Sequence, residues 1–104
     1  MIKVTPDAVT QIRLSAKQSG IAAPILRIAA KEQPDGSLHY AMGFDDAISD
    51  KDHRFQIEGI EMVVSEMSEP LVRDMTIDFV ELDNGEKNFI FLNPQDKNYS
   101  PPAE

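Results

Sequence analysis

The chain carries few side chains that could do covalent or metal chemistry. Its 104 residues include two histidines and no cysteine, which excludes disulfide bonds, thiolate nucleophiles and thiolate metal ligands. Asp35 and His39 are the best remaining pair, because a turn that ends at Asp35 could bring the two side chains together. A carboxylate and a neutral imidazole can both bind iron. We treat them as candidate ligands that need a second copy of the chain to complete a site; a surface histidine beside a turn aspartate is the simpler interpretation.

The densest acidic stretch lies between residues 45 and 53. It contains four aspartates and ends at His53. A calcium loop of the EF-hand kind needs alternating acidic residues, a central glycine and a closing glutamate. Counted from Asp46, the sixth position is Lys51 and the twelfth is Ile57, so this pattern fails. We interpret the stretch as a solvated surface loop, with recognition of a partner's basic patch as the alternative.

No pattern in the chain marks out an enzyme. There is no glycine-rich phosphate loop, no nucleophile elbow and no His-Glu zinc motif. A catalytic triad would need a serine that nothing in the sequence distinguishes. Four methionines could suggest a soft metal site, but methionine also fills cores readily, and we predict that most of them are core residues: Met42, Met62, Met67 and Met75.

Charge and length exclude several further classes of function. The formal net charge is −8, from 18 acidic and 10 basic side chains, with no cluster of lysine and arginine. Such a chain repels nucleic acid and anionic membrane surfaces, so neither is an expected partner. The longest apolar runs, such as 89–92, are too short to cross a membrane, and the first residues lack an apolar signal core. We expect a single domain in the cytoplasm.

The first helix has a start and a stop that can be read from the sequence. Thr5 can cap the helix, Pro6 suits its first position, and Asp7 is favourable near its positive end. Apolar residues then recur at helical spacing, and Gly20 is a typical stop. These signals predict a helix over residues 6–19.

The remainder of the chain reads as short strands joined by tight turns. Strands are predicted at 2–4, 24–30, 38–44, 54–58, 60–64, 76–82 and 88–92. Hairpins are expected about Asp35-Gly36 and Gly59, and a short late helix with Ser68 as its cap. The fold class is therefore α+β, mainly antiparallel, with one N-terminal helix and a short late helix. We place the domain at residues 1–94 and expect a mobile C-terminal tail at 95–104, in which Tyr99 could be a recognition element.

Several fragments, in this order and spacing, resemble the HesB-like or A-type iron–sulfur carrier family, also called the IscA-like proteins. The resemblance covers nearly the whole chain and implies the same fold and a context of iron–sulfur cluster assembly. The fragments that carry it are Thr5-Pro6, Leu26-Arg27-Ile28, Tyr40 with Phe44, Gly59-Ile60 through Val63-Val64, Ile77-Asp78-Phe79-Val80, and Phe89-Ile90-Phe91-Leu92-Asn93-Pro94.

In that family three cysteines bind the cluster, and the resemblance places their positions on Asp35, Ser100 and Pro102 of this chain. None is a thiol, and a proline side chain can bind no metal. We therefore expect no iron–sulfur cofactor and no catalysis. The favoured hypothesis is an accessory domain that binds a protein partner in cluster assembly or a client of it. The alternatives are iron bound by Asp35 and His39 across a symmetric interface, and a purely structural subunit; a homo-oligomer remains open.

Overall fold

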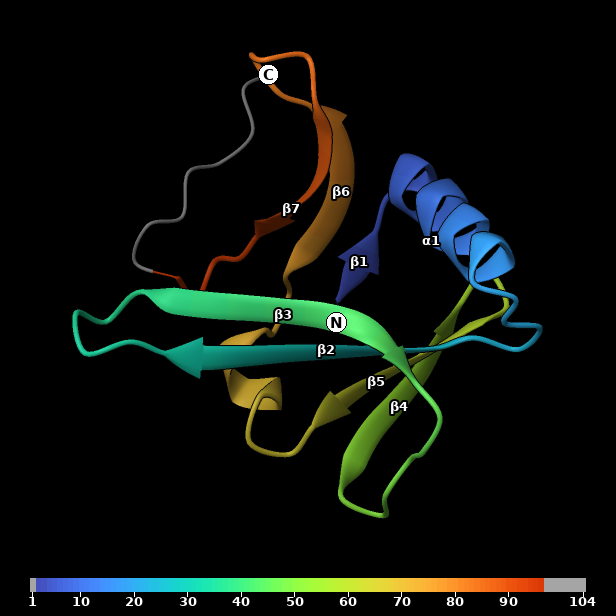
Figure 1. Cartoon of the computed structure of the whole chain (residues 1–104). Helices are drawn as coiled ribbons and strands as arrows, with labels where there is room; N and C mark the ends of the chain where they lie inside the picture. The colour runs from blue at the N-terminus through green and yellow to red at the C-terminus, as the bar shows by residue number, and fades with distance from the viewer. Residues whose placement is uncertain (1, 97–104) are drawn as a thin grey trace.

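The computed structural model describes residues 2–96 and confirms the predicted α+β class, with one N-terminal helix and mostly antiparallel strands. A short 3-10 helix, η1, stands where the late helix was expected (Figure 1). In chain order the elements are β1 (Lys3–Val4), α1 (Pro6–Gln18), β2 (Ile25–Glu32), β3 (Leu38–Asp45), β4 (Asp52–Ile57), β5 (Ile60–Ser65), η1 (Glu69–Leu71), β6 (Thr76–Glu81) and β7 (Lys87–Leu92).

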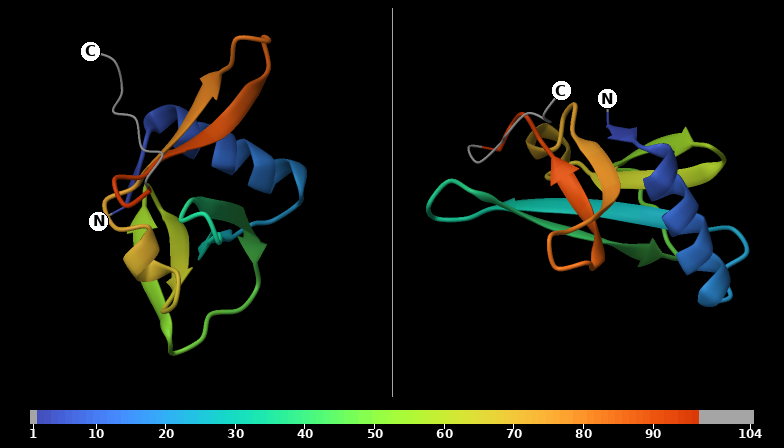
Figure 2. Two further views of the ribbon diagram at one scale, coloured as in Figure 1. Left: turned by 90° about the vertical axis from the view of Figure 1, so that its left-hand side faces the viewer. Right: turned by 90° about the horizontal axis from the view of Figure 1, so that it is seen from above.

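The strands form two sheets. One has four strands in the order β3-β2-β5-β4, and the other has three in the order β1-β6-β7. The β2–β3, β4–β5 and β6–β7 pairs are antiparallel, whereas β2–β5 and β1–β6 are parallel. Helix α1 and the β6–β7 hairpin lie on the same side of the four-stranded sheet (Figures 1 and 2). This arrangement lets one apolar layer between them serve both sheets.

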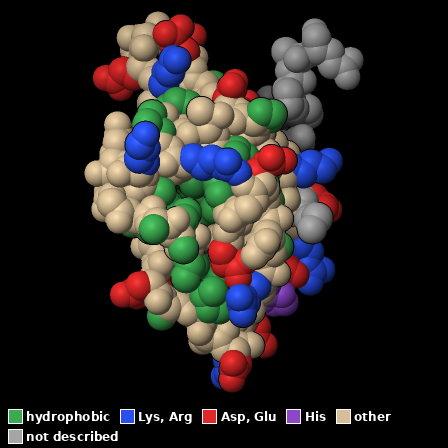
Figure 3. Space-filling model, turned by 90° about the vertical axis from the view of Figure 1, so that its right-hand side faces the viewer, with side chains coloured by type: hydrophobic (Ala, Val, Ile, Leu, Met, Phe, Trp, Pro, Cys, Tyr) green, Lys and Arg blue, Asp and Glu red, His purple; other side chains and the backbone are tan. Residues whose placement is uncertain are grey.

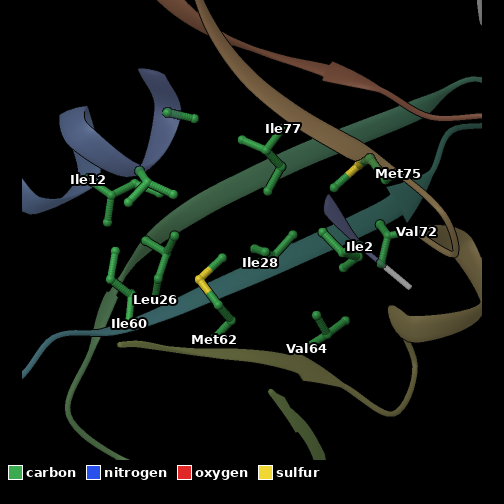
Figure 4. Packing of buried hydrophobic residues seen from close by; sticks show 12 residues of the cluster. Ile2, Ile12, Leu26, Ile28, Ile60, Met62, Val64, Val72, Met75 and Ile77 are labelled. Atoms are coloured by element: carbon green, nitrogen blue, oxygen red, sulfur yellow. The ribbon is translucent and has the colours of Figure 1, made fainter. Parts of the chain in front are cut away.

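The core fills that layer. Fully buried side chains come from α1, from the two central strands of the larger sheet and from β6, as with Ile12, Ile28, Met62 and Ile77 (Figure 4). Val72 and Met75 close the core on the side of η1. The parallel strands β2 and β5 are central, which explains why their inward residues are almost all aliphatic.

Helix α1 begins as its sequence predicts. The Thr5 hydroxyl accepts a hydrogen bond from the Ala8 amide at 3.2 Å and donates one to the Asp78 carboxylate at 2.6 Å. Thr5 therefore caps the helix and also ties its start to β6. At the other end the cap is Ser19, followed by Gly20 at φ +73°.

Both predicted hairpins form. The β2–β3 turn includes Gly36 at φ +87°, and the β4–β5 turn places Glu58 and Gly59 at φ +52° and +82°. Two successive positive φ values are typical of a type I′ turn, whose twist suits a two-residue hairpin. The Arg13 side chain on α1 donates a hydrogen bond to the Glu58 carbonyl, which anchors this turn to the helix.

Ser68 stands at the N-cap position of η1, but the prediction that it caps this helix with its side chain was wrong. The Ser68 hydroxyl instead donates to the Ala30 carbonyl at 3.3 Å and accepts from the Ala30 amide at 3.2 Å. Ser68 is buried, so its hydroxyl needs these backbone partners on β2. The prediction that most of the four methionines are core residues is confirmed, because Met62 and Met75 are buried and Met42 packs against the core, whereas Met67 is 88% exposed.

Within residues 2–96, no helix is long and apolar enough to span a membrane. The cytoplasmic location stays a prediction, as does the domain boundary at residue 94. Gln95 and Asp96, which were assigned to the tail, belong to the described part of the chain and form a turn after Asn93.

Replacing Thr5 tests the link between α1 and β6. We expect Thr5→Ala to lower the free energy of unfolding by about 1–2 kcal/mol, because a cap and the Asp78 bond are both lost. Urea unfolding measures this change. Thr10→Ala is the control, since Thr10 is exposed and bonds only to the helix backbone at Pro6. Equal losses in the two variants would contradict the assigned role of Thr5.

Candidate functional site

A buried asparagine lies where the last strand ends. Asn93 is 1% exposed, and its amide group donates to the Leu71 carbonyl at 2.7 Å and to the Tyr40 hydroxyl at 3.1 Å. Its side-chain oxygen accepts from the Gln95 amide at 3.0 Å. One side chain therefore joins the end of β7, the end of η1, strand β3 and the turn that follows.

Tyr40 extends this network to the start of the C-terminal segment. Its hydroxyl donates to the Asp96 carboxylate at 2.8 Å, and its ring stacks on Phe91 with centroids 4.9 Å apart. Burial of the phenol, and then the bond to Asp96, raise the pKa of Tyr40 to about 12. The hydroxyl therefore remains a donor throughout the physiological range. The amide of Asp96 also donates to the Asn93 carbonyl at 3.0 Å, which closes the turn.

Asp35 lies at the turn between β2 and β3 and is exposed. Its carboxylate accepts hydrogen bonds from the Ser37 amide at 2.9 Å and the Ser37 hydroxyl at 2.6 Å, and these bonds hold its pKa below the usual range. His39 is exposed on β3, paired in register with Lys31 of β2. The geometry thus gives Asp35 a local turn-forming role. Iron binding by Asp35 and His39 stays a prediction.

The other two positions from the resemblance, Ser100 and Pro102, lie outside the described residues, as does Tyr99. Within residues 2–96, no three or more His, Asp or Glu side chains gather so that they could hold a metal ion. The whole chain offers no thiol. The thiolates that ordinarily bind iron–sulfur clusters are therefore absent from this chain.

A second polar network crosses the acidic stretch that was expected to be solvated. Arg27 on β2 contacts Asp45 at 2.6 Å and binds both oxygens of Asp52 at 2.9 and 2.8 Å. Its guanidinium also donates to the Ala47 carbonyl at 3.2 Å. The Asp52 side chain is only 5% exposed, and the bonds to Arg27 hold its pKa well below the ordinary range.

The solvated-loop prediction was therefore wrong for Asp45 and Asp52. Asp45 ends β3 and Asp52 begins β4, so the loop between these strands covers only 46–51. A single arginine in the otherwise apolar run 25–30 was the signal that these carboxylates have an internal partner. There was less indication of the Asn93 network in the sequence. The family resemblance drew attention to Tyr40 and Asn93, and no sequence feature marked out Asp96.

The comparisons with known proteins agree with this architecture. A model of the family described as "Iron-sulphur cluster biosynthesis" matches residues 1–97. The chain belongs to the iron–sulphur cluster biosynthesis family. A protein of Aquifex aeolicus is 38% identical over 80 residues, which cover 77% of this chain and 69% of that protein.

Two solved structures of family members share the fold. The structure of IscA with a [2Fe-2S] cluster has a TM-score of 0.74 at 28% identity, covering 90% of this chain and 86% of that one. SufA from Escherichia coli, described as involved in the biosynthesis of iron–sulfur clusters, has a TM-score of 0.74 at 26% identity, covering 96% and 86%. This member of the family keeps the fold and lacks every cysteine.

Removing the Asn93 carboxamide should loosen three segments at once. We expect Asn93→Ala to lower the free energy of unfolding by about 1–3 kcal/mol, because the Leu71 carbonyl and the Tyr40 hydroxyl, both partly buried, each lose a partner. Chemical denaturation gives the value. Asn88→Ala is the matched control, since Asn88 lies on the same strand and is exposed. A loss no greater than that of the control would disprove the network's role.

The Arg27 network predicts a pH dependence. A carboxyl whose pKa is depressed on folding stabilises the protein above its unfolded pKa of about 4, and this contribution fades as the pH falls below that value. We expect Asp52→Asn to lower the melting temperature at pH 7, with the difference from the parent shrinking towards pH 2. Asp46→Asn is the control on the exposed part of the loop. A difference that is constant with pH would contradict the assignment.

Proposed function

We propose that this chain is a non-catalytic, protein-binding member of the iron–sulphur cluster biosynthesis family. It acts beside cluster assembly or delivery through contacts with another protein, and carries no cluster on its own side chains. The observation that carries the proposal is that the chain has the family fold, held by the Tyr40–Asn93–Asp96 network, while it has no thiol. The scaffold is maintained without the ligands that a cluster would require.

The chemistry of the donors supports the absence of a carried cluster. Of the family ligand positions, Asp35 is a hard oxygen donor, Ser100 a hydroxyl and Pro102 has no donor atom. The Asp35 carboxylate is further committed to Ser37 by two hydrogen bonds. For iron bound by Asp35 and His39, the described residues of one chain add no third ligand, so a second copy would have to supply the others.

A surface hollow supports a role in protein binding. It measures about 440 Å³ and lies between the end of α1, the segment after it and the β4–β5 turn. Ile21, Pro24 and Ile60 supply apolar lining. The charged residues that line it are Arg13, Lys17 and Glu58. Hydrophobic side chains gather in the middle of this face with lysine and arginine side chains beside them (Figure 3). Apolar surface with a charged rim is typical of protein contact sites.

Anaerobic reconstitution with ferrous iron and sulfide tests the proposal. We expect the parent chain to develop no stoichiometric visible absorption, because it supplies no thiolate. The triple variant Asp35→Cys, Ser100→Cys, Pro102→Cys should gain such absorption if the fold still presents the family positions. Stoichiometric absorption in the parent would overturn the proposal.

The proposed binding to another protein is tested by a separate experiment. A tagged parent chain, used as bait in extract of its own cells, should enrich proteins of cluster assembly or cluster-containing clients, identified by mass spectrometry. The control bait is Ile21→Asp with Ala22→Asp, which places charge in the hollow at two positions outside the buried core. Enrichment equal to that of empty beads would contradict a partner among these proteins.

A further inference from the structure

The turn at the tip of the β6–β7 hairpin contains the dipeptide Asn84-Gly85. Residues 81–88 are all exposed, and Figure 1 shows the hairpin extending away from the four-stranded sheet. The Gly85 amide donates to the Leu82 carbonyl at 2.9 Å, and the Leu82 amide donates to the Glu86 carbonyl at 2.7 Å. With Gly85 at φ +84°, these bonds are typical of a three-residue hairpin loop that closes with a left-handed glycine.

The β2–β3 turn has the same pattern, with an aspartate in place of the asparagine. Its glycine, Gly36, has φ +87°. The Asp35 carboxylate accepts a hydrogen bond from the Ser37 amide at 2.9 Å. In the same way, the Asn84 side-chain oxygen accepts a hydrogen bond from the Glu86 amide at 3.0 Å. The residue before the glycine can therefore carry either a carboxylate or a carboxamide in this type of turn.

We propose that Asn84 is a site of spontaneous deamidation, in which water is the only co-reactant. The backbone nitrogen of Gly85 attacks Cγ of Asn84 and forms a new C–N bond. The bond from Cγ to the side-chain nitrogen breaks, and that nitrogen leaves as ammonia with the proton that the Gly85 nitrogen gives up. The chain is left with a five-membered succinimide ring. Water then adds to one of the two ring carbonyl carbons and breaks its bond to the nitrogen, which yields aspartate or isoaspartate.

The surroundings of Gly85 permit this reaction. Glycine has no side chain to hinder the approach of its own nitrogen to Cγ of Asn84. A Cβ atom placed on Gly85 would meet no atom within 4 Å, so the space beside the turn is open. The bond from the Gly85 amide to Leu82 holds the nitrogen while the turn is closed, so attack follows opening of the turn. None of residues 81–88 is buried, and the tip can therefore open without disturbing the core.

The other asparagines of the described part lack these features. Asn88 is exposed, but it pairs within the β7 ladder and precedes the bulky Phe89. Asn93 is 1% exposed and precedes Pro94, whose nitrogen carries no hydrogen to give up and so cannot close the ring. Within residues 2–96, an exposed asparagine followed by glycine in a turn occurs at Asn84 alone.

The two products would affect the hairpin differently. Aspartate reproduces the chemistry of the Asp35 turn, so it can keep the bond to the Glu86 amide. Isoaspartate places an extra methylene in the main chain, which changes the length of the loop and displaces the bonds that close it. Each product adds one negative charge to a chain whose net charge is −8. The modification is independent of the proposed function, because it needs only this turn and water.

Peptide mapping of the full, folded chain tests the proposal. The chain is incubated in mildly alkaline water enriched in heavy oxygen, which marks the amides lost during the incubation. Cleavage after Arg73 and Lys87 then places Asn84 and Asn88 on separate peptides. We expect Asn84 to lose its amide about tenfold or more faster than Asn88, because glycine follows it and the hairpin tip opens more readily than the strand. The labelled product should be a mixture of isoaspartate and aspartate.

Two variants serve as controls. Asn84→Gln keeps a carboxamide but would have to close a six-membered ring, so its amide should stay intact. Asn84→Asp is the aspartate product and should melt with the parent, because Asp35 forms the equivalent turn; a lower melting temperature would contradict the likeness of the two turns. Loss of the amide at Asn84 no faster than at Asn88, or a labelled product that contains aspartate and no isoaspartate, would overturn the proposal.

Discussion

The Asn93 side chain needs partners because it is buried, and it finds them in three separate segments. It binds the carbonyl that ends η1, the hydroxyl of Tyr40 on β3 and the amide of Gln95 just beyond β7. A buried amide left without these bonds would cost more free energy than most single contacts supply. The two sheets therefore cannot move independently at this point, and the chain leaves β7 in a fixed direction.

Much of the fold could be predicted because its signals are local. Thr5 and Pro6 set the start of α1 within one helical turn. The two hairpins follow from glycines at Gly36 and Gly59, which tolerate the positive φ that each turn requires. The strands between these points need only alternate apolar and polar residues, a pattern that can be read without knowledge of their neighbours.

The partners within the polar networks could not be identified from the sequence, because they are distant along the chain. Ser68 has the residue type of a cap, but it binds Ala30, 38 residues away. Arg27 binds Asp52 across 25 residues, and Tyr40 binds Asp96 across 56. The neighbours of these side chains in the sequence do not reveal their partners, because buried polar groups bond to whatever the fold brings beside them. The family ligand positions came only from the resemblance, and two of the three lie outside the described residues.

This protein therefore has the fold of its family without the cysteines that serve as cluster ligands. The fold of this chain rests on apolar packing and on the Asn93 network, and neither needs a thiol. The most direct measurement of the central claim is native mass spectrometry of the chain isolated anaerobically from its own cells. The account predicts the mass of the polypeptide alone, as monomer or dimer. A stoichiometric mass increment of iron with inorganic sulfide would contradict it.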